Sequence, residues 1–107
     1  MAHFLLQVAY SSAAWASMLK KPQDRLAIVA KAVEHLGGKV KGGWLCFGDY
    51  DTVAILEMPD NVSAAAFAMA VAAQGACKSV KTTPLLTPDE GIAAEKLAVT
   101  SGYTLPT

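Results

Sequence analysis

The sequence predicts a single α+β domain built on an antiparallel sheet with helices on one face. Three observations lead to this expectation. Segments with a period of two, typical of half-buried strands, are interleaved with segments whose apolar residues recur at helical spacing. Two strand-like runs are joined by Gly48-Asp49-Tyr50-Asp51, a tetrapeptide typical of a hairpin turn. The chain has 107 residues, which is enough for one hydrophobic core and no second domain.

The first predicted elements are a strand and two short helices. Residues 3–10 alternate with a period of two and contain aromatic and branched side chains, as in a strand. Ser11-Ser12 supplies an N-cap for a short helix that ends at about Leu19. Lys21-Pro22 breaks this helix and starts another, because proline is tolerated in a first turn and disfavours helix in the residue before it. Asp24 is then expected in the first turn of the second helix.

A hairpin follows this second helix. Gly37-Gly38 ends the helix in the usual manner. Residues 40–47 and 52–58 are β-prone runs on either side of the Gly48-Asp49-Tyr50-Asp51 turn. Gly42-Gly43 inside the first run predicts a bulge or a close approach of another chain segment.

The last predicted elements are a helix, a strand and a second helix. Asp60 is expected to cap an alanine-rich helix that ends at Gly75 and, being apolar on most sides, is expected to be buried on most sides. Residues 77–86 form the last predicted strand. Thr87-Pro88-Asp89-Glu90 is a capping box that begins a helix to about Val99, and a C-terminal tail starts at about residue 100.

This order of elements predicts a four-stranded ferredoxin-like βαββαβ arrangement with an extra C-terminal helix. Its sheet has helices on one face, which leaves the other face open. Hydrophobic residues make up 53% of the chain and charged residues 17%, against about 25% charged in typical soluble domains. We therefore expect the open face to mediate self-association as a homodimer or higher oligomer. The alternative is a monomer whose many alanines pack its helices tightly.

Composition argues against several classes of function. The net charge is zero and Arg25 is the one arginine, so no basic patch predicts binding to nucleic acid. No apolar run is long enough to span a membrane, and the chain is expected to be cytoplasmic. Cys46 and Cys77 lack metal-ligand spacing and are expected to be small buried side chains, with a disulfide between them left open. We expect no metal and no cofactor.

Short motifs along the chain also carry a family resemblance. They are Leu36-Gly37-Gly38-Lys39-Val40-Lys41-Gly42-Gly43-Trp44, Gly48-Asp49-Tyr50-Asp51-Thr52-Val53, Met58-Pro59-Asp60, Ala73-Gln74-Gly75 and Leu86-Thr87-Pro88-Asp89-Glu90. In this order, from His3 to about Ala98, the chain resembles the GYD-domain family. The resemblance implies a dimeric α/β barrel, in which two ferredoxin-like sheets face each other. It supplies no catalytic residues, and the wider superfamily includes monooxygenases, haem-handling enzymes and effector-binding domains, so whether the chain is an enzyme stays open.

One group of residues is a candidate small-molecule site. The break at Lys21-Pro22 is expected to hold the helix that carries Trp15 away from the sheet and to leave a gap. The predicted walls, floor and polar contacts of a site for an apolar or aromatic ligand are Tyr10, Trp15, Trp44, Met69, His3 and Asp51. Under the alternative interpretation the aromatic residues fill the core and the chain is an interaction module without chemistry. A cavity of a few hundred cubic ångströms would favour ligand binding.

The hairpin residues are expected to serve structure rather than chemistry. Asp49 and Asp51 are expected to accept hydrogen bonds from nearby backbone N–H groups of the turn. Tyr50 is expected to pack on a neighbouring surface. Gly48 tolerates backbone angles that other residues resist, and if it adopts a positive φ, a branched residue in its place would be strained.

Overall fold

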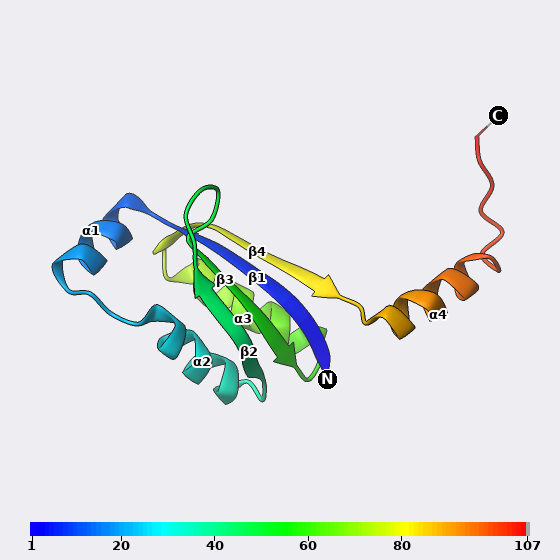
Figure 1. Ribbon diagram of the computed structural model, residues 1–107, viewed down its shortest axis with the longest axis horizontal. Helices are drawn as coiled ribbons and strands as arrows, with labels where there is room; N and C mark the ends of the chain where they lie inside the picture. The colour runs from blue at the N-terminus through cyan, green and yellow to red at the C-terminus, as the bar shows by residue number, and fades with distance from the viewer. Residues whose placement is uncertain (107) are drawn as a thin grey trace.

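The computed structural model describes residues 1–106 and shows an α+β fold with four antiparallel strands and four helices, as predicted (Figure 1). The elements are β1 (Ala2–Tyr10), α1 (Ser12–Lys20), α2 (Arg25–His35), β2 (Lys39–Leu45), β3 (Thr52–Met58), α3 (Asn61–Ala73), β4 (Cys77–Leu85) and α4 (Pro88–Ala98). Most bounds lie within two residues of the sequence-based expectation. The division of the first crossover into α1 and α2 is confirmed. The predicted tail is described as far as residue 106.

The four strands form one sheet in the order β2-β3-β1-β4. This order is compatible with the predicted ferredoxin-like arrangement. The central strand β1 pairs antiparallel with both β3 and β4, so that Leu5 lies between Ile55 and Thr83. The register of β2 against β3 shifts between Val40 and Gly42, which is the irregularity that Gly42-Gly43 predicts.

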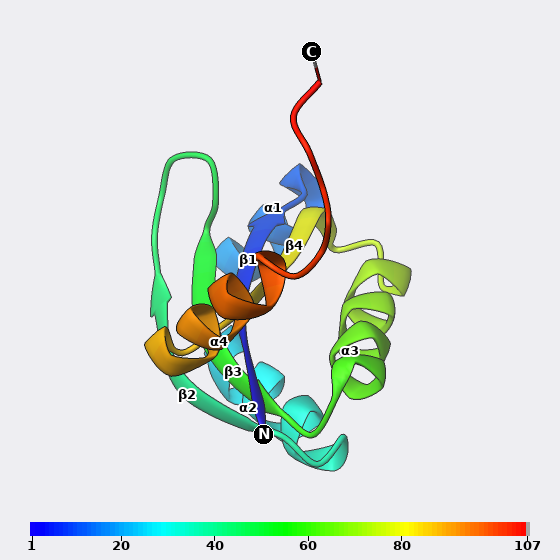
Figure 2. The same ribbon diagram turned by 90° about the vertical axis from the view of Figure 1, so that its right-hand side faces the viewer.

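The core lies between the sheet and the helices on one of its faces. Figure 2 shows α2 and α3 on the same side of the sheet. Alternate residues of β1 and β3 point to that side because successive side chains of a strand point to opposite faces. The buried residues of this cluster are Phe4, Leu6, Val8, Tyr10, Ala54, Leu56 and Met58 from the strands, with Val33, Ala64 and Phe67 from the helices. Within residues 1–106, no helix packs on the opposite face of the sheet, which is called the open face below (Figure 2).

Two helices differ from expectation. Asp24 is the N-cap of α2, accepting a hydrogen bond from the Ala27 N–H at 3.2 Å, and does not lie in the first turn. Pro22, two residues before Asp24, also lies outside the helix. The prediction that α3 is buried on most sides is wrong, since Val62 and Met69 are 77% and 70% exposed. The reason is that the sheet covers only one side of α3, although its apolar residues surround it.

The last helix, α4, stands away from the rest of the chain (Figure 1). It is well capped, because Thr87 and Glu90 form the predicted capping box and Pro88 occupies the first turn. None of its residues is buried. The radius of gyration is 17.0 Å, compared with about 13 Å for a compact domain of this length. Among residues 1–106, no helix has the length and apolar character needed to cross a membrane.

Candidate functional site

A cavity of about 530 Å³ lies on the helix side of the sheet. Residues of α1, α2, α3 and the adjoining ends of β1 and β4 line it, and we call it the helix-side cavity. Its apolar walls are formed mainly by Met18, Ile28, Val29, Phe67 and Val71, together with several alanines. A volume of this size falls within the usual range for small-molecule sites.

The cavity lies at the break between α1 and α2. Met18 from α1 and Ile28 from α2 are on either side of this break, and both line the cavity. The break allows α1 and α2 to form separate walls of the cavity, which one continuous helix could not do. The gap expected at Lys21-Pro22 is therefore present, although most of its walls come from α2 and α3.

A few polar side chains reach the cavity. Arg25, the first residue of α2, lines it together with Gln23 and Gln74. The Arg25 Nη1 group donates a hydrogen bond to Gln23 Oε1 at 3.0 Å. Cys77 also lines the cavity; burial raises the pKa of its thiol, and the positive charge of Arg25 opposes part of that rise.

Beside the cavity, Asp51 joins the hairpin to the end of β1. Its Oδ2 atom accepts hydrogen bonds from the Tyr10 backbone N–H at 2.9 Å and from the Trp15 indole Nε1–H at 3.3 Å. Its own backbone N–H donates to the Val8 carbonyl at 2.8 Å. We call this set of contacts the Asp51 clasp. The expectation that Asp51 bonds to nearby N–H groups of its own turn is wrong, because its carboxylate reaches residues that are 41 and 36 positions away.

The clasp also orders the two aromatic residues next to the cavity. The Tyr10 and Trp15 rings meet edge to face, with centroids 5.6 Å apart and an interplanar angle of 89°. The Tyr10 hydroxyl shares a buried hydrogen bond of 2.9 Å with Thr52 Oγ1. Tyr10 is buried and lines the cavity, whereas Trp15 is 39% exposed and borders it through Tyr10.

The other predicted site residues lie elsewhere. Trp44 is 61% exposed and pairs with Val53 on the open face. Met69 does not line the cavity and lies on an exposed part of α3. His3 is on the open face. The structure thus brings together Tyr10, Trp15 and Asp51 but separates these three from Trp44, Met69 and His3.

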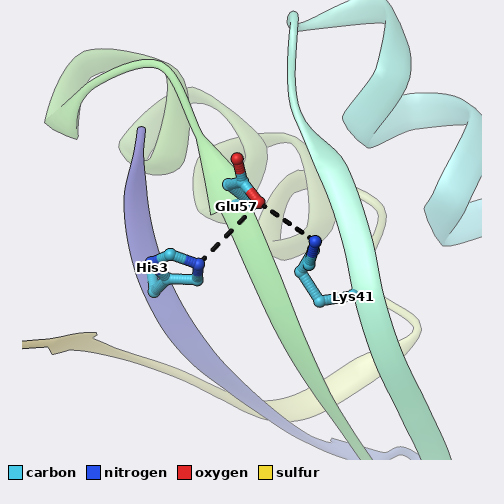
Figure 3. A network of polar contacts seen from close by, with 3 residues as sticks. All are labelled: His3, Lys41 and Glu57. Atoms are coloured by element: carbon cyan, nitrogen blue, oxygen red, sulfur yellow. Dashed lines mark ion pairs between the residues drawn. The ribbon is translucent and has the colours of Figure 1, made fainter. Parts of the chain in front are cut away.

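The open face carries a small polar network at one end, shown in Figure 3. Glu57 Oε2 lies 3.8 Å from His3 Nε2 and 3.5 Å from Lys41 Nζ. Because these side chains are partly exposed to water, the pairs contribute little to stability. Between this network and the hairpin, the open face carries an apolar strip of half-buried Leu5, Val53 and Ile55, with the polar Gln7, Lys81 and Thr83 beside it.

The hairpin tip has the expected backbone geometry. Gly48 has a φ of +122°, a backbone angle at which any residue with a side chain would be strained. Tyr50 is half-buried, and its carbonyl accepts a hydrogen bond from the Cys46 thiol at 3.2 Å. Asp49 is exposed and, among residues 1–106, has no side-chain hydrogen bond, so the turn bonding expected of it is not present. Cys46 and Cys77 are free thiols.

Sequence reasoning missed the contributions of α2 and α3 to the cavity. Arg25, Val29 and Val71 line it, and none of them was a candidate from the sequence. One signal was available, since Arg25 is the single arginine and directly follows the break between the two helices. In residues 1–106, no group of three His, Cys, Asp or Glu side chains is arranged to hold a metal ion.

Comparison with known proteins bears on the family but supplies no ligand. A search of curated proteins found no significant match. The family model described as the GYD domain matches residues 4–94, which is most of the chain and includes the hairpin and the residues of the Asp51 clasp. The chain therefore belongs to the GYD domain family.

Proposed function

We propose that this chain binds a small, largely apolar or aromatic molecule in the helix-side cavity. The observation that carries the proposal is the cavity of about 530 Å³ itself, lined by apolar side chains with a few polar groups among them. Sites for small molecules commonly combine apolar walls with a few polar groups that fix orientation. A tightly filled space between helices and sheet would have favoured a purely structural role.

Apolar burial would supply most of the binding free energy. Ile28 in α2 is 46% exposed and lines the cavity, so a ligand there would remove apolar surface from water. Each Å² of apolar surface removed from water contributes about 25 cal/mol. Trp15 provides a built-in reporter, since its ring contacts Tyr10, which lines the cavity.

A neutral probe tests this proposal. We expect 1-decanol to bind saturably and to change Trp15 emission, measured in a Trp44→Phe background so that one tryptophan remains. Ala70 lines the cavity, whereas its neighbour on the same helix, Ala72, does not. Ala70→Phe should weaken decanol binding at least about tenfold, a loss of about 1.4 kcal/mol, while Ala72→Phe leaves it unchanged. Absence of saturable binding, or equal effects of the two variants, would contradict the proposal.

A second function, self-association through the open face, has its own support. Leu5, Val53 and Ile55 form an apolar strip there, next to the exposed ring of Trp44. Apolar faces of this kind commonly mark interfaces. The projecting helix α4 also exposes an apolar side chain, Leu97. A second copy that covers the open face would give the dimeric α/β barrel that the family resemblance implies.

Charge favours a second copy as the occupant of the open face. The strand pairing places three lysines and one glutamate on the open face, namely Lys39, Lys41, Lys81 and Glu57. Together they give this face a net charge of +2 when His3 is uncharged. The projecting helix α4 has three acidic residues and one lysine, a net charge of −2. Two sheets facing each other would repel, and an α4 from each copy would offset that repulsion. In this proposal, α4 of one copy lies against the open face of the other.

Sedimentation measurements test the self-association. Ile55→Lys adds a charge to the centre of the open face and should convert the assembly into monomers. Leu19→Lys is the matched control, since Leu19 is exposed on α1, outside both the open face and the helix-side cavity. A wild-type chain that sediments as a monomer at low micromolar concentration would contradict this function and leave the ligand-binding proposal unaffected.

A further inference from the structure

Arg25 introduces a positive charge into a cavity that is otherwise uncharged. The residues that line the helix-side cavity include no Asp, Glu, Lys or His. Arg25 is also the only arginine in the 107-residue sequence. The guanidinium group therefore carries the one formal charge on an otherwise uncharged cavity wall.

The guanidinium has donors to spare. It carries five N–H groups, and its hydrogen bond within residues 1–106 goes from Nη1 to Gln23 Oε1. The ion pairs found in the same residues join His3 and Lys41 to Glu57, at the open face, and none involves Arg25. The nearest acid in sequence, Asp24, caps α2 through the Ala27 N–H. Within residues 1–106, no carboxylate thus forms an ion pair with Arg25.

The position of Arg25 on its helix adds to this positive potential. It is the first residue of α2; the N-cap Asp24 places one carboxylate at this end of the helix, and the first turn itself contains no acidic residue. Because the helix dipole has its positive end at the N-terminus, a cation there is unfavourable and an anion is favourable. The charge of Arg25 also extends into the cavity, since it opposes the rise in the pKa of Cys77 that burial causes.

We infer that the helix-side cavity binds an amphiphilic carboxylate, whose apolar body lies against Ile28, Val29 and Val71 and whose carboxylate pairs with Arg25. This inference rests on the proposed ligand-binding function and specifies the class of ligand. A guanidinium matches a carboxylate through two parallel hydrogen bonds, which Lys cannot reproduce. Gln23 lies beside Arg25: its Oε1 accepts from Arg25 and its Nε2 donates to the Lys21 carbonyl at 3.5 Å, which leaves one amide N–H for the same carboxylate.

The test compares two probes of equal chain length, decanoate and 1-decanol, by titration calorimetry at pH 8 and low salt. Wild type should bind decanoate more tightly than decanol. Arg25→Gln should weaken decanoate binding at least about tenfold and change decanol binding less than about twofold. Arg25→Lys keeps the positive charge but loses the two parallel hydrogen bonds, so its affinity for decanoate should lie between those of wild type and Arg25→Gln. Lys21→Gln is the control, because Lys21 is an exposed cation near α2 that does not line the cavity.

The results distinguish failure of carboxylate recognition by Arg25 from failure of ligand binding in the helix-side cavity. If wild type binds decanol and decanoate equally, or if Arg25→Gln weakens both by the same factor, the carboxylate inference is overturned while the cavity remains a binding site. If wild type binds neither probe, both fail. If decanoate binds Ala70→Phe as tightly as wild type, the carboxylate binds outside the cavity and the inference is overturned. Matching thermal midpoints for Arg25→Gln and wild type show that the variant is folded.

Discussion

Removal of the Asp51 carboxylate should destabilise the fold, although this side chain lies in a hairpin loop. In Asp51→Ala the Tyr10 N–H loses its acceptor at 2.9 Å. A buried donor left without a partner costs about 1–3 kcal/mol, and hydrogen bonds to charged groups lie toward the upper part of that range. The Trp15 indole N–H is exposed and can bond to water instead, so its loss adds little. We therefore expect a loss of about 2 kcal/mol in the free energy of unfolding.

Urea unfolding at a fixed protein concentration measures this loss, because self-association would otherwise change the apparent stability. The midpoint should fall by about 1 M for Asp51→Ala. Asp51→Asn keeps one acceptor oxygen and should lose about half as much. Asp49→Ala is the control in the same turn, since Asp49 is exposed and should change stability by less than about 0.5 kcal/mol. Equal stabilities for Asp51→Ala and Asp49→Ala would refute the clasp as a stabilising contact.

Three further predictions follow from the geometry. Gly48→Val should cost more than about 1 kcal/mol from backbone strain alone, because Gly48 has a φ of +122° and an added Cβ would meet nothing within 4 Å; an unchanged thermal midpoint would contradict this. Hydrogen bonds from the Ser63 backbone N–H and side chain lower the pKa of Asp60. The stabilisation by Asp60 should therefore be present above its ordinary pKa of 3.8 and be lost as pH falls through the lowered value, so the difference in thermal midpoint between wild type and Asp60→Ala should shrink on acidification. Because burial raises the pKa of Cys77, iodoacetamide should alkylate it more slowly at pH 8 than a cysteine in an unfolded peptide, and equal rates would count against the burial.

The parts of the fold that the sequence predicts are those fixed by local patterns. The alternation in residues 3–10 and the β-prone run of residues 52–58 predict two strands, and the register places the even-numbered residues of both on the buried face. Caps at Asp60 and Thr87 predict where α3 and α4 begin. The burial of α3 was mispredicted because composition tells how apolar a helix is but not how much of it a single sheet can cover. A helix apolar on all sides is expected to be buried, yet this one meets the sheet on one side only.

The candidate site was harder to predict because its contacts depend on strand register and on helix placement. Tyr10 and Asp51 meet since Val8 pairs with Thr52, which brings the end of the hairpin beside the end of β1. Trp44 points the other way, because its pairing with Val53 puts it on the open face. A change of one residue in the β2 register would reverse that assignment. Periodicity alone does not determine this register across the bulge at Gly42.

The Asp51 clasp connects the Gly48-Asp49-Tyr50-Asp51 hairpin to the helix-side cavity. The carboxylate of Asp51 holds the backbone of Tyr10, and the Tyr10 hydroxyl bonds to Thr52, the residue that follows Asp51. Tyr10 is thus held at its backbone by Asp51 and at its hydroxyl by Thr52, and it forms part of the cavity wall. The turn residues therefore touch no ligand in the proposed site, yet they determine where one of its aromatic walls stands. In the proposed ligand-binding function, Gly48-Asp49-Tyr50-Asp51 therefore acts through the packing of the sheet end and not through contact with the ligand.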